Sequence, residues 1–176
     1  MQHGDLLLMD FGAEYANYAA DITRTVPVDG KFSPRQKQVY QSVLNIYKET
    51  ISLFKPGMTI HKINDYVFKR MDEELIKLGL YTEEDIKNQS KEKPLFKKYF
   101  MHNTSHFIGL DVHDVGQREV VFQAGMVLSC EPGIYIAAEG IGIRLETDVV
   151  VGENPIDLFA EVPIEIEEIE ALFALS

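Results

Sequence analysis

The chain has 176 residues, of which 45% are hydrophobic, and a formal charge of −11. This length and composition predict a single globular domain over residues 1–176 and exclude a disordered chain. The acidic balance argues against nucleic acid and anionic membranes as partners, and no apolar run is long enough to span a bilayer. The single cysteine, Cys130, and a first segment without the pattern of a signal peptide predict a reducing, cytoplasmic setting.

The first predicted element is a β-hairpin. Residues 5–10 form a short apolar run that ends in an acid, and residues 19–28 form a second run that ends near Pro27. Residues 12–15 between them have the composition of a turn. Two strands joined this closely are expected to pair with each other.

Two amphipathic helices are predicted next. Ser33 is a good N-cap and Pro34 suits the first helical position, so one helix begins here and ends before Pro56. Another begins after Thr59 and ends before Gly79, a residue that suits the position following a helix. Apolar positions recur every three or four residues: Val39, Val43, Ile46, Thr50 and Leu53 in the first helix, and Ile60, Ile63, Val67, Met71, Leu75 and Leu78 in the second.

The rest of the chain is predicted to form a polar segment followed by a mostly antiparallel sheet. Residues 82–98 are lysine-rich, which indicates a short helix capped by Thr82, a surface loop, and another short helix near 94–99. Strands are expected over three ranges: 105–111, 125–136 and 141–151. The second and third of these are expected to pair, and an acidic helix should open at Pro163. This order of elements is typical of an α+β fold.

Four acidic residues fall within apolar or glycine-rich strand segments. They are Asp10, Asp21, Glu131 and Glu146. Carboxylates are rarely buried without a partner, and an arginine or a backbone amide is the simpler explanation for any one of them alone. The set of four is harder to explain in this way, because the same strands offer little positive charge beyond Arg24 and Arg144. Divalent cations would balance the charge, and two ions sharing carboxylates lie roughly 3.5 Å apart.

Three histidines add an imidazole to these oxygen donors. They are His102, His106 and His113, all within twelve residues. A lone histidine is more often a packed or exposed residue than a ligand, but three beside a glycine-containing turn favour a site. The helical zinc-protease motif is absent, because Asn103 rather than glutamate follows His102.

Four motifs resemble those of one family. Residues 106–116, HFIGLDVHDVG, resemble the histidine segment of the pita-bread metallopeptidases, in the Xaa-Pro aminopeptidase (aminopeptidase P) and prolidase branch. The aspartates occur in DFGAEY at 10–15 and ADITRT at 20–25, which resemble the family's paired aspartates. The glutamates occur in EPGIY at 131–135 and GIRLE at 142–146. The match runs across nearly the whole chain and implies the pita-bread (creatinase/aminopeptidase) fold.

The resemblance implies a centre of two divalent metal ions. Its five ligands would be Asp10 on one ion, Asp21 and Glu146 bridging both, and His106 and Glu131 on the other. Oxygen donors with one imidazole favour Mn2+, and Zn2+ or Co2+ are compatible alternatives. A hydroxide that bridges the ions would be the nucleophile.

The resemblance also implies roles around the metal ions. Glu131 would carry the proton to the leaving proline nitrogen, and His113 would hydrogen-bond the carbonyl oxygen or the oxyanion. His102 would shape the proline pocket. Arg144 would support a ligand carboxylate, and Tyr135 would support the pocket.

The activity implied is hydrolysis of the Xaa-Pro bond at the N terminus of peptides, so proline-containing peptides are the expected partners. Residues 104–106 and the acidic residues 165–168 favour aminopeptidase P over prolidase, the Xaa-Pro dipeptidase. In this family, further sequence of the catalytic domain usually precedes the first aspartate and includes another active-site histidine. His3 is too close to Asp10 to take the role of that histidine. The alternative to an active peptidase is a truncated metal-binding fragment without activity. The chain is also expected to form homo-oligomers or to associate with a missing N-terminal segment.

Overall fold

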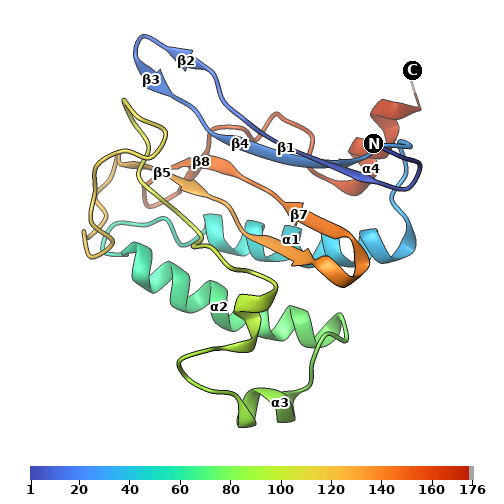
Figure 1. Cartoon of the computed structure of the whole chain (residues 1–176). Helices are drawn as coiled ribbons and strands as arrows, with labels where there is room; N and C mark the ends of the chain where they lie inside the picture. The colour runs from blue at the N-terminus through green and yellow to red at the C-terminus, as the bar shows by residue number, and fades with distance from the viewer. Residues whose placement is uncertain (175–176) are drawn as a thin grey trace.

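Helices and strands occupy separate layers in the computed structural model, which describes residues 1–174. Helices α1 (Pro34–Ile51) and α2 (Ile60–Lys77) cover one side of the strands (Figure 1). Helix α4 (Ile166–Phe173) packs against α1. The α+β class expected from the sequence is therefore confirmed.

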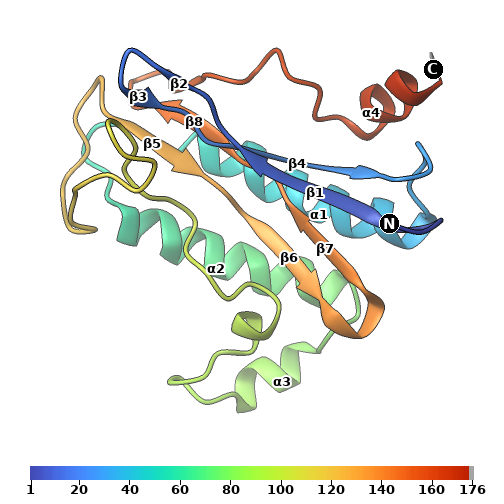
Figure 2. The same ribbon diagram turned by 45° about the horizontal axis from the view of Figure 1, so that its top comes forward.

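The predicted helices form because their end signals are local. The side chain of Ser33 caps α1, and that of Thr59 caps α2. Thr82 caps α3 (Glu83–Asn88), and the 3-10 helix η1 (Leu95–Lys98) forms the short helix predicted near 94–99; both lie beyond α2 (Figure 2). The apolar stripes of the two long helices form the helical side of the main hydrophobic core; Leu53, which lies beyond the end of α1, is only partly buried.

The strands form two hairpins that lie side by side. In the first hairpin, β1 (Leu6–Phe11) pairs antiparallel with β4 (Ile22–Pro27). The second hairpin is long and interrupted, with β5 paired to β8 and β6 paired to β7. Its strands are β5 (Val127–Cys130), β6 (Gly133–Ile136), β7 (Ile141–Arg144) and β8 (Thr147–Val150). The 3-10 helix η2 (Ala137–Glu139) closes this hairpin, and β9 (Ile156–Asp157) adds to β8.

The first hairpin extends beyond its predicted turn. The turn predicted at 12–15 is wrong, because β2 (Glu14–Tyr15) pairs with β3 (Tyr18–Ala19) in that region. The chain reverses instead at Ala16 and Asn17, whose φ angles are 51° and 68°. Two successive residues with positive φ are typical of the tightest hairpin turns, which match the twist of the flanking strands.

The strand predicted at 105–111 does not form. Phe107 makes a single bridge to Leu128, and the chain then curls into a tight loop. The backbone N–H of Asp114 donates to the carbonyl oxygen of Phe107 at 3.0 Å, and the Asp114 carboxylate accepts from the backbone N–H of Leu110 at 3.0 Å. The Asp114 carboxylate thus gives the Leu110 backbone N–H the hydrogen-bond partner that a neighbouring strand would otherwise supply.

The final helix begins later than predicted. Pro163 was expected to open it, whereas α4 begins at Ile166 after an extended Glu165 at the N-cap.

Within residues 1–174, none of the helices combines the length and the apolar character needed to cross a membrane.

Candidate metal centre

Three of the five expected ligands converge where the two hairpins meet. One ligand atom from each of Asp21, His106 and Glu146 lies within 4.8 Å of the other two. Asp21 directly precedes β4, and Glu146 lies in the gap between β7 and β8, bridged to Thr23 of β4. His106 comes from the irregular segment, and its Nε2 lies 3.5 Å from Asp21 Oδ2.

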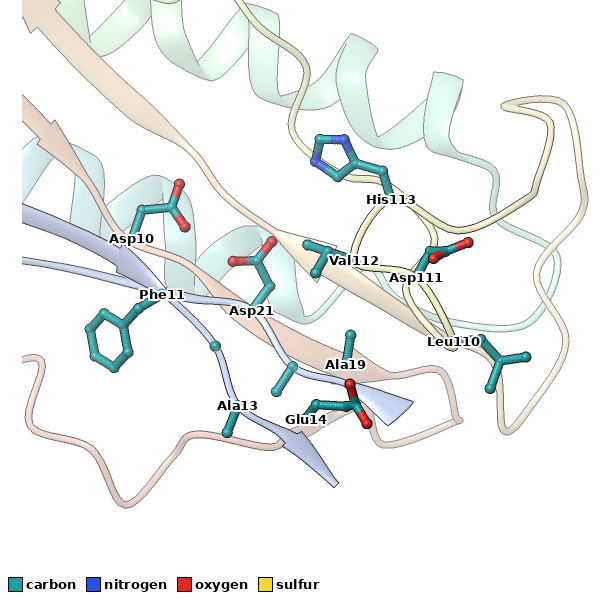
Figure 3. Close-up of a pocket in the computed structure, with 12 residues that line it drawn as sticks. Asp10, Phe11, Ala13, Glu14, Ala19, Asp21, Leu110, Asp111, Val112 and His113 are labelled. Carbon is teal, nitrogen blue, oxygen red and sulfur yellow. The ribbon is translucent and has the colours of Figure 1, made fainter. Parts of the chain in front are cut away.

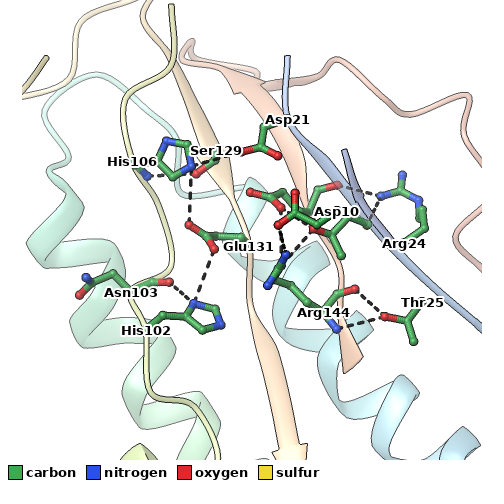
Figure 4. A network of polar contacts seen from close by, with 12 residues as sticks. Asp10, Asp21, Arg24, Thr25, His102, Asn103, His106, Ser129, Glu131 and Arg144 are labelled. Atoms are coloured by element: carbon green, nitrogen blue, oxygen red, sulfur yellow. Dashed lines mark hydrogen bonds and ion pairs between the residues drawn. The ribbon is translucent and has the colours of Figure 1, made fainter. Parts of the chain in front are cut away.

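Glu131 lies beside this cluster on its histidine side (Figure 4). Its Oε1 is 3.8 Å from His106 Nε2, and its Oε2 is 3.6 Å from His102 Nδ1. His102 is itself fixed at both ring nitrogens, with Nδ1 2.8 Å from the Asn103 carbonyl oxygen and Nε2 2.8 Å from the Tyr135 hydroxyl. Glu131 therefore faces two imidazoles.

Asp10 approaches from β1 and is connected to the cluster by Arg144. The guanidinium Nη2 of Arg144 forms an ion pair with Asp10, and its Nε lies 3.6 Å from Glu146 Oε2. Its Nη1 donates to the Tyr135 hydroxyl at 3.4 Å. The Asp10 side chain is 53% exposed, whereas the Glu146 side chain is 3% exposed. The site is consequently open on the Asp10 side.

His113 stands between two recesses at this site. Its ring centroid lies 4.3 Å from that of His106. One recess, of about 410 Å³, has Asp10 and Asp21 among its lining residues (Figure 3). The other, of about 340 Å³, is lined in part by His106 and Glu131. Space for parts of a small ligand therefore exists on both sides of His113.

Arg24, the other arginine of these strands, does not reach the acids. It is buried, and its guanidinium donates to the carbonyl oxygens of Thr23 at 3.0 Å, Glu146 at 2.8 Å and Pro163 at 3.2 Å. Among the described residues, Arg144 is thus the one arginine or lysine paired with the expected ligand carboxylates.

Three further polar residues contact the expected ligands and were not identified from the sequence. Thr23 Oγ1 donates to Glu146 Oε2 at 2.5 Å, Ser129 Oγ accepts from the backbone N–H of His106 at 3.0 Å, and Asp148 Oδ2 accepts from the backbone N–H of Asp21 at 3.0 Å. All three had a signal, because side chains two residues apart share one face of a strand. Thr23 follows Asp21 at this spacing, Ser129 precedes Glu131, and Asp148 follows Glu146.

Comparison with known proteins identifies the family. The model of metallopeptidase family M24 matches residues 1–153. The chain belongs to family M24. A relative, the Xaa-Pro aminopeptidase of Escherichia coli (strain K12), is 42% identical over 98% of this chain, and Xaa-Pro aminopeptidase 3 of Homo sapiens is 36% identical over 98%. The chain spans 42% and 36% of the lengths of these two proteins.

Solved structures of aminopeptidase P match along the whole chain. Proline aminopeptidase P II from Yersinia pestis superposes with a TM-score of 0.90 at 41% identity, covering 100% of this chain and 43% of that one. Zinc-substituted E. coli aminopeptidase P in complex with product gives 0.89 at 41% identity, covering 99% and 42%. These matches confirm the resemblance and the pita-bread fold expected from the motifs.

The electrostatics of this M24 site fit a divalent cation. Burial raises the pKa of Glu146 to about 8, that of Glu131 to about 7 and that of Asp148 to about 6. Burial opposes the charge of His106, but its hydrogen bond to Asp21 and the neighbouring carboxylates raise its pKa to about 9. Without a cation the buried carboxylates therefore hold protons more readily than usual, and carboxylate oxygens with one imidazole are donors that divalent cations bind.

Proposed function

We propose that this chain forms the metal-binding part of an Xaa-Pro aminopeptidase, which hydrolyses the bond before proline at the N terminus of peptides. The convergence of Asp21, His106 and Glu146 carries the proposal, because three donors suited to a divalent cation meet within 4.8 Å at low exposure. The E. coli relative, which is 42% identical and is an Xaa-Pro aminopeptidase, supports proline-containing peptides as the substrate class.

Two divalent cations would be held in the proposed centre by five ligands. Asp10 would serve one ion, His106 and Glu131 would serve the other, and the carboxylates of Asp21 and Glu146 would be available to both. Four carboxylates and one imidazole favour Mn2+, with Zn2+ and Co2+ as compatible ions. Divalent cations in such a centre supply Lewis acidity and make water a nucleophile at neutral pH.

The remaining roles follow from what each side chain contacts. Glu131 borders the recess on the histidine side, where it can move a proton from water to the leaving nitrogen. His113 borders both recesses, so it is placed to hydrogen-bond a carbonyl oxygen between them. His102 is held by Tyr135 and shapes the pocket for proline. Arg144 orients Asp10 through their ion pair.

An assay of two substrates with the Mn2+-loaded chain tests this function. Release of the first residue from an Xaa-Pro-Yaa tripeptide supports the aminopeptidase. Turnover of an Xaa-Pro dipeptide alone would favour prolidase. Mn2+ binding without turnover of either peptide would identify a metal-binding fragment.

We also propose that the chain forms homo-oligomers or associates with an N-terminal segment. Strand β1 pairs with β4 on one side, and its other edge has no partner strand within residues 1–174. An unpaired edge with partly exposed leucines is a surface that another strand can cover. A monodisperse monomer in light scattering would contradict this.

The buried, unpaired Cys130 agrees with the proposed cytoplasmic location.

A further inference from the structure

Strand β4 and the β7–β8 arm lie side by side, joined by a single backbone bridge. The bridge pairs Thr23 with Glu146, and the backbone N–H of Glu146 donates to the Thr23 carbonyl oxygen at 3.1 Å. The same antiparallel register places residue 21 opposite 148 and residue 25 opposite 144. At these two flanking positions, side chains take the place of backbone partners.

The two flanking positions are held in different ways. The Thr25 hydroxyl donates to the Arg144 carbonyl oxygen at 3.0 Å and accepts from the Arg144 backbone N–H at 3.2 Å. At the other position, Asp148 Oδ2 accepts the backbone N–H of Asp21 at 3.0 Å. Thr25 therefore holds the end of this arm at Arg144, whereas Asp148 holds the end that carries Asp21; between them, Thr23 and Arg24 also bond to Glu146.

Asp148 is not explained by fold stability. The residue is 3% exposed, and its Oδ1 is buried without a hydrogen-bond partner among the described residues. A buried carboxylate with one oxygen unsatisfied costs stability, and an apolar residue suits the middle of such a strand better. The one side-chain hydrogen bond that this carboxylate makes within residues 1–174 goes to Asp21.

We infer that Asp148 is a positioning residue that fixes the backbone of Asp21, so that the Asp21 carboxylate meets Glu146 and His106. Asp21 lies in the gap between β3 and β4, where no strand ladder holds its main chain. Because Asp148 stands two residues after Glu146, its hydrogen bond ties together the two carboxylates proposed to be shared between the cations. This inference rests on the proposed function, because the metal centre that Asp148 would support is part of that proposal.

Two variants of the full chain separate the hydrogen bond from the charge. Asp148→Ala removes the acceptor, whereas Asp148→Asn keeps an acceptor oxygen and removes the charge. Amide hydrogen exchange at Asp21 without metal should quicken about tenfold in the alanine variant. Its Mn2+ affinity by calorimetry should fall roughly 10–100-fold, while the asparagine variant stays within about threefold of the parent in both measurements.

Two further variants control for destabilisation. Glu74→Ala removes another carboxylate of 3% exposure from α2, far in the fold from Asp21, and should leave Mn2+ affinity within about threefold. If Asp148→Ala does not fold, as judged by circular dichroism, Asp148→Val removes the acceptor with a residue suited to strands.

The outcomes distinguish this inference from the proposed function. If the parent binds Mn2+ and the alanine or valine variant binds it equally well, the positioning role of Asp148 is overturned and the metal centre stands. Equal losses in the asparagine and alanine variants would also overturn it, because charge would then be the cause. A parent chain that binds no Mn2+ overturns the metal centre and this role with it.

Discussion

Replacing Thr23 by valine removes the hydroxyl group that connects the buried Glu146 to Arg144. Thr23 is fully buried, and its Oγ1 donates to Glu146 Oε2 at 2.5 Å and accepts from Arg144 Nε at 3.0 Å. A hydrogen bond to a charged group contributes about 1.5–3 kcal/mol to stability. Valine keeps the shape of threonine, so the substitution removes the hydrogen bonds and leaves the packing in place. With a urea dependence of about 2 kcal/mol per M, a loss of about 2 kcal/mol lowers the unfolding midpoint by about 1 M.

The same substitution should weaken metal binding. Residues that orient a metal ligand are typically worth roughly 10–100-fold in affinity, so the Mn2+ dissociation constant measured by calorimetry should rise by about that factor. Thr25→Val is the matched control, because Thr25 is equally buried and bonds only to the main chain of Arg144. It should lose about 1 kcal/mol and keep Mn2+ affinity within about threefold. If Thr23→Val is destabilised yet binds Mn2+ as the parent does, Thr23 does not orient Glu146.

Three other changes test separate parts of the molecule. Glu131→Gln should lower kcat on a tripeptide by about 10²–10⁴-fold. Mn2+ should still raise the melting temperature of this variant. An unchanged kcat would exclude Glu131 as the proton carrier. Removing Mn2+ with a chelator should lower the melting temperature by about 5–10 °C, since saturation at about 100 times the dissociation constant contributes about 2.7 kcal/mol. Arg70 hydrogen-bonds Glu49 and lowers its pKa, so their pair stabilises the fold above the ordinary glutamate pKa and loses this effect as the pH falls through the lowered value. Arg70→Met should therefore cost about 1 kcal/mol in urea unfolding at pH 7 and much less near pH 3, and equal losses would contradict the assignment.

The helical half of the fold could be predicted because its signals are local. The caps at Ser33 and Thr59 and the apolar stripes that follow them depend on neighbouring residues alone. The strands expected at 125–136 and 141–151 were also found, but each is interrupted. Pro132 has no backbone N–H to give to a ladder, which explains one interruption beside Glu131. The sequence therefore contained this signal.

The arrangement of the site was only partly predictable. Motifs identified the five expected ligands, but they did not show that Arg24 turns away from them. Strand alternation could have done so, because Arg24 lies between Thr23 and Thr25 and must face the opposite side. The loop that carries His113 had no such signal, since the bonds of the Asp114 carboxylate to the backbone leave no trace in the hydrophobic pattern.

The polar neighbours of the ligands explain why the cluster remains available for cations. Arg144, which pairs with Asp10 and lies 3.6 Å from Glu146, orients a carboxylate and also offsets part of its charge. A hydroxyl group or a carboxylate oxygen fixes a ligand residue without doing so, as Thr23 does for Glu146, Ser129 for the backbone of His106, and Asp148 for the backbone of Asp21. Burial raises the pKa values of Glu131 and Glu146, and the nearby Arg144 offsets this only in part, so the ionised forms are disfavoured in the metal-free fold. Buried carboxylates that are held in place and are costly to ionise favour binding of divalent cations, which would displace their protons, at the expense of the stability of the metal-free fold.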